Sequence, residues 1–266
     1  MNDIVISSLH IYPVKSAAGV EVDAARVTDR GFAHDRRWMV VAPDGTFITQ
    51  RSHPKLALVR PSLGGGELRL ERAGAAPLVV PAELGRGAEL EVEVWGERCK
   101  ALDAGDEAGR WFGEELGTDC RLVFMPESTR RAVDPKHGGA DDIVSFADGY
   151  PFLLIEQASL EDLNGRLDAP VPMDRFRPNI VVDGAEAFAA DDWERVRIGK
   201  VEFRVAKPCD RCVVTTIDQA TGEKGKEPLR TLATYRREGS KVLFGQNLIQ
   251  QNEGVVRVGD RLEVLE

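Results

Sequence analysis

The chain consists largely of short runs in which apolar and polar residues alternate, and glycine or proline separates one run from the next. An alternation with a period of two places the apolar side chains on one face of an extended strand. The runs at Ile4–Ile11, Val20–Val22 and Leu90–Val94 follow this pattern. Because many short strands separated by turns close most readily into a barrel or a sandwich, we predict a mainly β fold with a few helices, of the α+β class.

Turn residues between these runs predict hairpins, since Asp-Gly and glycine-rich turns connect neighbouring strands. Two such hairpins are expected, Arg37–Ala42 with Thr46–Thr49 and Leu56–Arg60 with Glu67–Leu70, and a third turns near Gly96. Further strands are expected at Asn179–Val182, Val201–Val205, Val213–Ile217, Val255–Val258 and Leu262–Leu265.

The pattern predicts helices at Asp106–Leu116, at Ser159–Leu167, and from Pro228 to about Arg237. Ser159 precedes an aspartate by three residues, as in a capping box, and proline is favoured in the first turn of a helix. Residues 127–150 show no clear periodicity. Long loops in compact proteins are usually functional, so we expect a functional loop there. The chain is expected to divide into two β-rich domains, residues 1–105 and 106–266.

Composition excludes several classes of protein. The 266 residues carry a formal net charge of −9, which disfavours binding to nucleic acid or to an anionic membrane, because both require a positive face. No apolar segment approaches the ~20 residues that span a bilayer, and the first residues lack the regions of a signal peptide. Four cysteines are too few for a disulfide framework. We therefore predict a reduced, cytoplasmic protein and expect a monomer.

One local motif stands out, Cys209-Asp210-Arg211-Cys212, which leads into a β-branched run. A zinc site would need two more ligands, whereas the other two cysteines and the four histidines are scattered. A redox dithiol is normally placed at the start of a helix, whereas a strand is expected here. The cysteines could also be packing groups. These three interpretations stay open, although Lys207 and Arg211 would favour a thiolate beside them.

A thiolate at the start of a strand, next to an arginine, also suits a metal that an anionic cofactor carries together with its other ligands. Basic and amide groups should then recur at turns, where they can hold the cofactor's phosphate. Such groups occur at Lys15-Ser16, at Arg36, and at Arg177 and Asn179. Arginine is well suited to this role because its parallel N–H groups match the geometry of phosphate.

Taken together, these motifs resemble the MOSC-domain family with its N-terminal β-barrel partner, in particular the amidoxime-reducing components and their bacterial relatives. The resemblance extends from residue 12 to residue 260. It comprises Tyr12–Ser16, Asp35–Trp38, Phe176–Ile180, Cys209–Cys212 with Thr215, Thr216 and Asp218, and Phe244–Gln246 with Val258–Asp260. It implies an N-terminal β-barrel-like domain followed by a MOSC β-barrel domain, with the molybdenum cofactor, Mo-molybdopterin, bound between them.

The resemblance also implies roles for individual residues. Cys212 matches the family's metal ligand and would coordinate molybdenum through its thiolate, whereas Cys209 would be a packing neighbour. Asp148 would be a second catalytic residue, near the metal. The positions that match cofactor contacts, or lie close to the cofactor, are Lys15, Ser16, Arg36, Asp148, Gly149, Tyr150, Arg177, Asn179, Asp210, Arg211, Cys212 and Asn247.

Three of these positions depart from the family pattern. Asp210 stands where many relatives have a small hydroxyl residue, and a carboxylate there would repel phosphate unless Lys207 or Arg211 compensates. Gly149 and Tyr150 likewise replace hydroxyl-bearing residues that help to bind the cofactor in some relatives.

The implied function is that of a molybdenum-cofactor-dependent oxidoreductase. It would reduce N-hydroxylated small molecules, such as amidoximes, hydroxylamines and N-hydroxylated bases, by oxo transfer. Asp148 would deliver protons, and electrons would come from a separate protein of the ferredoxin, flavoprotein or cytochrome type, because no iron–sulfur domain or membrane anchor is expected. The alternatives are a molybdopterin-binding or sulfur-carrier module without reductase activity, and a plain β-rich binding domain.

Overall fold

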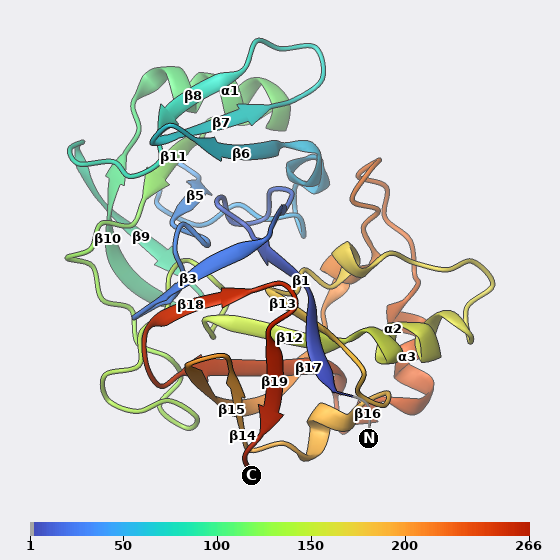
Figure 1. Cartoon of the computed structure of the whole chain (residues 1–266). Helices are drawn as coiled ribbons and strands as arrows, with labels where there is room; N and C mark the ends of the chain where they lie inside the picture. The colour runs from blue at the N-terminus through green and yellow to red at the C-terminus, as the bar shows by residue number, and fades with distance from the viewer. Residues whose placement is uncertain (1–2) are drawn as a thin grey trace.

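The computed structural model describes residues 3–266, and its largest element is a closed barrel of seven strands (Figure 1). The strands follow the order β12, β13, β1, β19, β14, β15 and β17, and the pairing of β17 with β12 closes the ring. Their bounds are β1 Ile4–Ile11, β12 Phe152–Glu156, β13 Ile180–Asp183, β14 Arg195–Ile198, β15 Val201–Asp210, β17 Lys241–Gln250 and β19 Arg261–Val264. Two short strands extend the barrel sheet, β2 (Val20–Val22) beside β1 and β16 (Arg237–Glu238) beside β17. The predicted β-rich, α+β fold is confirmed.

A second unit lies above the barrel in Figure 1 and is built from two smaller sheets. One sheet has the order β5 (Trp38–Val41), β11 (Arg121–Phe124), β10 (Glu97–Asp103) and β9 (Glu89–Val94), and the other consists of β6 (Arg60–Gly64), β7 (Glu67–Glu71) and β8 (Leu78–Pro81). Trp38, Leu56 and Phe112 are buried together in its core. Since β11 pairs with β5, the N-terminal sheet includes residues beyond 105, and the division of the chain at that residue stays a prediction.

The N-terminal segment belongs to both units. β1 is one of the strands of the barrel wall, where it pairs with β13 and β19. A small sheet of β18 (Gly254–Arg257), β3 (Ala24–Thr28) and β4 (Gly31–Phe32) joins the two ends of the chain. Phe32 meets Phe152 edge to face at 4.8 Å, and Phe152 meets Phe203 in the same way at 5.2 Å. The barrel core is therefore completed by residues from the first part of the chain.

Three α-helices occur where the sequence predicts them, two of them with shifted bounds. α1 spans Asp106–Leu116, as predicted, because Trp111 and Phe112 are buried on one face and Gly117 ends the helix in the left-handed conformation. α2 spans Gln157–Asn164 and so begins before Ser159, whose hydroxyl is buried and bonds to the side chain of Glu156 instead of capping the helix. α3 spans Leu229–Tyr235 and begins directly after Pro228.

Three strand predictions are wrong. Val213–Thr216 forms a 3₁₀ helix, η4, because Thr215 and Thr216 turn their hydroxyls back to the carbonyls of Cys212 and Val213. Pro54 starts another 3₁₀ helix, η1 (Pro54–Leu58), where a strand from Leu56 is expected, and β6 follows it. Thr46–Thr49 contributes two isolated bridges, Phe47 with Val41 and Thr46 with Glu93, instead of a strand. The remaining 3₁₀ helices are η2 (Met173–Arg175) and η3 (Ala189–Asp192).

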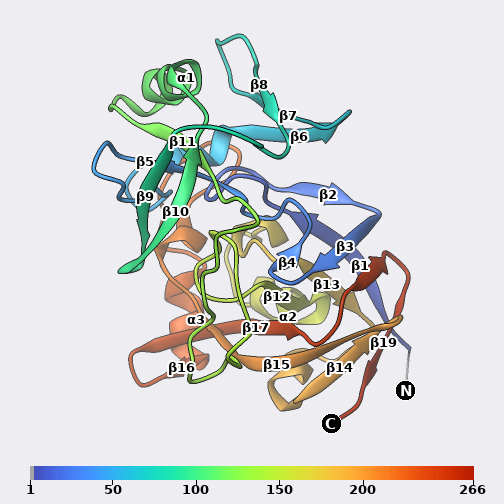
Figure 2. The ribbon, with the colours of Figure 1, turned by 90° about the vertical axis from the view of Figure 1, so that its left-hand side faces the viewer.

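The long loop between β11 and β12 passes from the upper unit down to the barrel (Figure 2). It contains the expected loop, residues 127–150, and no helix or strand is assigned within those residues, all of which the structure describes. Ile143, Val144 and Phe146 are nonetheless buried. The loop is therefore packed against both units and can hold side chains in fixed positions.

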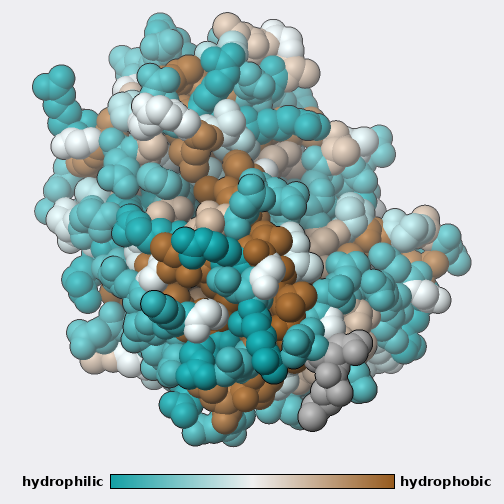
Figure 3. All heavy atoms as spheres, in the orientation of Figure 1, coloured by the Kyte–Doolittle hydropathy of each residue, from teal (hydrophilic) through white to brown (hydrophobic). Residues whose placement is uncertain are grey.

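The surface is largely hydrophilic, in keeping with the net charge of −9. Figure 3 shows apolar side chains gathered near the middle of the face seen in Figure 1, around β18 and β19. Val255, Val258 and Val264 are each about two-fifths exposed in this region. These three valines lie on or beside the strands that bring the C-terminus back to the barrel.

Gly245 gives a test of how tightly the barrel closes. Its φ is +78°, and an added Cβ would lie 2.7 Å from Ile155 Cγ1 and 2.8 Å from the carbonyl oxygen of Leu154. Gly245→Ala should therefore lower the free energy of unfolding by about 2–5 kcal/mol, the sum of backbone strain and crowding. Gly259→Ala is the matched control, because Gly259 has a φ of +86° but open space around it, and about 1–2 kcal/mol is expected. Equal losses in urea denaturation would show that crowding at Gly245 has no effect.

Candidate functional site

One cavity of about 180 Å³ brings together segments from both units. Its lining includes every residue that the sequence predicts for a cofactor site: Lys15, Ser16, Arg36, Asp148, Gly149, Tyr150, Arg177, Asn179, Asp210, Arg211, Cys212 and Asn247. They come from the turn after β1, the turn before β5, the end of the long loop, the turn before β13, the segment after β15, and β17. Their common location is a property of the fold, whereas their contacts with a ligand stay a prediction.

Cys212 lies two residues after the end of β15, at the start of η4. The expectation that its thiol is held at the start of a strand is therefore wrong, and the following turn is only four residues long. The side chain is partly exposed to the cavity. Arg51 donates a hydrogen bond from Nη2 to the Cys212 sulfur at 3.2 Å, so a cation faces the thiol directly.

Cys209 has different surroundings. It lines the cavity and also packs against the apolar cluster that includes Phe176 and Phe244, and Arg211 donates from Nη1 to its sulfur at 3.0 Å. Both cysteines of the motif line the cavity, and each sulfur accepts a hydrogen bond from an arginine, Cys209 from Arg211 and Cys212 from Arg51. A nearby cation favours the thiolate form of a cysteine, and the choice of Cys212 as the metal ligand stays a prediction.

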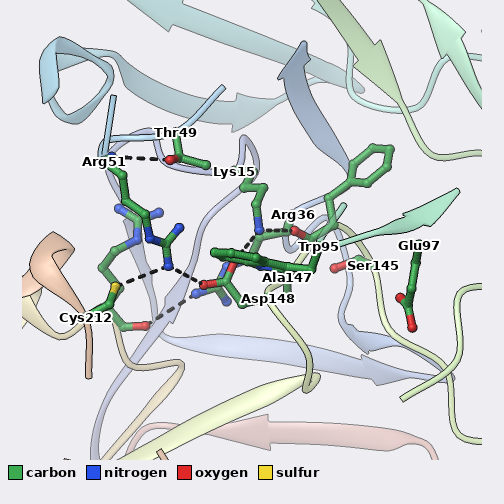
Figure 4. Close-up of polar contacts among 12 residues, drawn as sticks. Lys15, Arg36, Thr49, Arg51, Trp95, Glu97, Ser145, Ala147, Asp148 and Cys212 are labelled. Atoms are coloured by element: carbon green, nitrogen blue, oxygen red, sulfur yellow. Dashed lines mark hydrogen bonds and ion pairs between the residues drawn. The ribbon is translucent and has the colours of Figure 1, made fainter. Parts of the chain in front are cut away.

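Lys15 and Asp148 form an ion pair at the centre of the site (Figure 4). Lys15 Nζ is 2.5 Å from Asp148 Oδ1 and also donates to the carbonyl oxygen of Phe146. Burial lowers the pKa of Lys15 to about 8, although Asp148 opposes this change. Partial burial would raise the pKa of Asp148, but the charges of Lys15 and Arg51 outweigh it and hold that pKa well below its ordinary value. Near neutral pH, Asp148 is ionised and Lys15 is mostly protonated.

Arg131, from the long loop, fixes the backbone that carries Asp148. Its guanidinium is buried and donates to the carbonyl oxygens of Ser145, Ala147 and Asp148, while Nε pairs with Glu97 at 2.7 Å. One side chain thus holds the loop segment 145–148 against β10. Sequence analysis did not single out Arg131, because its partners lie on backbone positions that no sequence motif marks.

Two arginines from different segments of the chain stack on the ring of the same tyrosine. The guanidinium carbons of Arg36 and Arg177 each lie 4.3 Å from the centre of the Tyr12 ring. Arg36 also donates to Asp35 and Asn179, and Asn179 donates to Asp35, so these groups form one buried network. Asn179 is fully occupied within this network, which makes it a residue that orients Arg36.

The backbone is strained at three of the predicted positions. Ser16, Arg36 and Arg177 have φ values of +69°, +48° and +56°, in the left-handed region that side-chain-bearing residues rarely adopt. Such conformations cost of order 1–3 kcal/mol each and persist where the surroundings impose them, most often at functional sites. The strain therefore supports the view that these residues are placed for a ligand.

The remaining predicted residues contribute in smaller ways. The Asp210 carboxylate accepts a hydrogen bond from the Val242 amide. Arg211 Nε is buried without a hydrogen-bond partner. Asn247 donates to the carbonyl oxygens of Lys207 and Pro208. The Tyr150 hydroxyl is also buried without a partner. These two unsatisfied donors lie in lining residues and are available to a ligand.

Arg51 and Trp95 are the main residues that sequence analysis missed. Arg51 bridges Cys212 and Asp148, and its guanidinium lies 4.6 Å from the centre of the Trp95 ring. The rule that identified Lys15, a basic residue just after an expected strand, also applies to Arg51 after Thr46–Thr49. Trp95 lies in the predicted hairpin turn near Gly96. That turn belongs to none of the motifs that predicted the site, so nothing in the sequence marked Trp95.

The charges of the lining suit an anionic ligand. Lys15, Arg36, Arg51, Arg177 and Arg211 face two carboxylates, Asp148 and Asp210. This local positive excess exists in a chain whose net charge is −9. Within residues 3–266, no three His, Cys, Asp or Glu side chains gather in a way that could hold a metal ion. A metal at Cys212 would therefore have to arrive with most of its ligands already in place, as the donor set of this cavity allows.

Fold and site together define a two-unit β-barrel protein whose interunit cavity combines thiols with an excess of cationic side chains. Residues 3–119 match the MOSC N-terminal beta barrel domain, and residues 141–263 match the MOSC domain. The chain belongs to the MOSC-domain family, as the sequence motifs predicted.

Similar proteins cover nearly the whole chain. It is 40% identical to mitochondrial amidoxime reducing component 2 of Rattus norvegicus, over 96% of this chain and 81% of that protein. It is 36% identical to mitochondrial amidoxime-reducing component 1 of Homo sapiens, over 98% and 82%. A third relative, the molybdenum cofactor sulfurase of Oryza sativa subsp. japonica, is 34% identical over 92% of this chain and 32% of that protein.

The helices of the structure were compared with the length and hydropathy that a membrane span requires. Among residues 3–266, no helix has the length and apolar character needed to cross a bilayer. Two of the relatives carry the word mitochondrial in their names, and the cytoplasmic location expected from the sequence stays a prediction.

Proposed function

We propose that this protein is a molybdenum-cofactor-dependent oxidoreductase that reduces N-hydroxylated small molecules, including amidoximes, hydroxylamines and N-hydroxylated bases. The observation that carries the proposal is the placement of the Cys212 thiol in a cavity with five cationic side chains. The names of the amidoxime-reducing relatives, which are similar over almost the full chain, support the same reaction. Overall, two electrons and two protons break the N–O bond, and the amine-level product and water are released.

The residues present fit such a cofactor. Cys212 offers a soft thiolate ligand, and Arg36, Arg177 and Arg211 offer charge-assisted donors for a phosphate group. The unpartnered Nε of Arg211 is consistent with a missing acceptor. When bound, the molybdenum centre would supply the two-electron chemistry, and the protein would supply ligation, orientation and protons.

The ionisation states in the cavity favour Lys15 as the proton donor. A general acid works best when its pKa is near the working pH, which holds for Lys15 Nζ at about 8. Asp148, whose pKa is far below neutral, is a poor donor and would instead hold Lys15 and Arg51 in place. We therefore assign to Asp148 an orienting role, where sequence analysis expected it to deliver protons.

A second candidate is a molybdopterin-binding or sulfur-carrier module without reductase activity. The relationship to a protein named molybdenum cofactor sulfurase favours it, because the matching region covers 92% of this chain. We further propose that the reductase is a monomer that receives electrons from a separate ferredoxin, flavoprotein or cytochrome. A basic face on that partner would be attracted by the net charge of −9.

Turnover separates the two candidates. The protein, purified from a host that makes the cofactor, is assayed for molybdenum and then given a chemical electron donor and benzamidoxime. We expect benzamidine to form at a rate proportional to the molybdenum content. Stoichiometric molybdenum without product would refute the reductase and favour the binding or sulfur-carrier module.

A further inference from the structure

Trp95 lies at the tip of the β9–β10 hairpin, and its side chain is 51% exposed. Its φ is +54° and that of Gly96 is +84°, the pattern of a type I′ turn, in which asparagine is the favoured first residue. A tryptophan at this position is strained by its backbone and leaves a large apolar ring in water. Neither the turn nor the core explains why this side chain is a tryptophan.

The contacts of Trp95 point to the cavity. Its indole N–H donates to Asp148 Oδ1 at 3.2 Å, and the edge of the Phe47 ring supports it, with ring centres 5.1 Å apart. Arg51 stacks on the indole and reaches the Cys212 sulfur with the same guanidinium. Figure 4 shows Trp95, Arg51, Asp148 and Cys212 converging from different segments of the chain. A rigid aromatic surface is thus held one side chain away from the thiol.

We propose that Trp95 and Arg51 form a shelf that binds planar, π-conjugated substrates beside Cys212, and that Trp95 determines specificity among N-hydroxylated compounds. The inference rests on the proposed function, because it names which of those compounds the site prefers. A flat substrate stacks on the exposed indole, while its N-hydroxylated end points toward Arg51 and Cys212. An aliphatic analogue lacks the stacking surface, so it loses affinity without losing the reactive group.

Two amidoximes with the same reactive group test the shelf. Benzamidoxime and acetamidoxime are titrated calorimetrically into the protein, with and without the cofactor and with no electron donor, so that nothing turns over. Wild type should bind benzamidoxime more tightly. Trp95→Asn, which suits the turn, should weaken benzamidoxime binding by roughly three- to tenfold, the range of one aromatic pair, and leave acetamidoxime unchanged. Trp95→Phe should keep most of the preference, since stacking remains.

Trp193→Phe is the matched control, because Trp193 packs against the barrel core. Benzamidoxime should quench the fluorescence of wild type and of Trp193→Phe, but not of Trp95→Phe. The shelf would be overturned if a folded Trp95→Asn protein still bound benzamidoxime more tightly than acetamidoxime. It would also be overturned if wild-type protein bound neither amidoxime, with or without the cofactor. Turnover without any Trp95 effect would keep the proposed function and reject the shelf, whereas Trp95-dependent binding without turnover would do the reverse.

Discussion

Replacing Cys212 with serine is expected to remove bound molybdenum and to lower N-reduction by more than about a hundredfold. The physical reason is the softness of the thiolate as a metal ligand. Cys209, the other cysteine in the lining, packs against the apolar cluster around Phe176 and is expected to be a packing neighbour. Residues that merely orient a metal ligand are worth roughly 10–100-fold, so loss of the ligand itself should cost more. Metal content is measured together with activity.

Cys209→Ser is the control for this experiment. Cys209 lies three residues away in the same motif and also accepts a hydrogen bond from an arginine, so the two variants differ mainly in which thiol is lost. Molybdenum should stay near the wild-type level in Cys209→Ser. If Cys212→Ser retains stoichiometric molybdenum, or if both variants lose it equally, Cys212 is not the ligand.

The second large effect concerns pH. Burial lowers the pKa of Lys15 to about 8, so its amine is protonated below that pH and neutral above it. A step that needs this proton should therefore slow as the pH rises through about 8. Lys15→Met fills the same buried space without a charge, and turnover at neutral pH should fall by about 10²–10⁴-fold, the usual contribution of a general acid. The alkaline fall should disappear from the residual activity.

Rates are measured between pH 6 and about 10, with molybdenum content determined for each variant so that a loss of cofactor is recognised. Lys55→Met, which removes an exposed lysine from η1, controls for the change in net charge. An unchanged alkaline fall in Lys15→Met would assign that fall to another group. A variant that has lost its molybdenum would instead identify Lys15 as a cofactor-binding residue, the role that the sequence motif implies.

Local patterns predicted much of the secondary structure. α1 begins and ends at the predicted residues, because its buried face has the helical period and Gly117 stops it. One failure occurred where side chains bond to the nearby backbone. Thr215 and Thr216 belong to a β-branched run that favours a strand, yet their hydroxyls stabilise a 3₁₀ turn. Propensity was overridden there by hydrogen bonds that no periodicity reveals.

By itself the sequence determined the β-rich class, the family, and many of the residues that line the cavity, because these follow from periodicity and from short motifs. The tertiary structure alone decided which of them meet. Lys15 pairs with Asp148 across 133 positions, and Arg51 reaches Cys212 across 161. Such contacts depend on how the barrel closes and on where the long loop packs. The pKa of Lys15 depends on burial, so Lys15 could be proposed as the proton donor only after the fold was known.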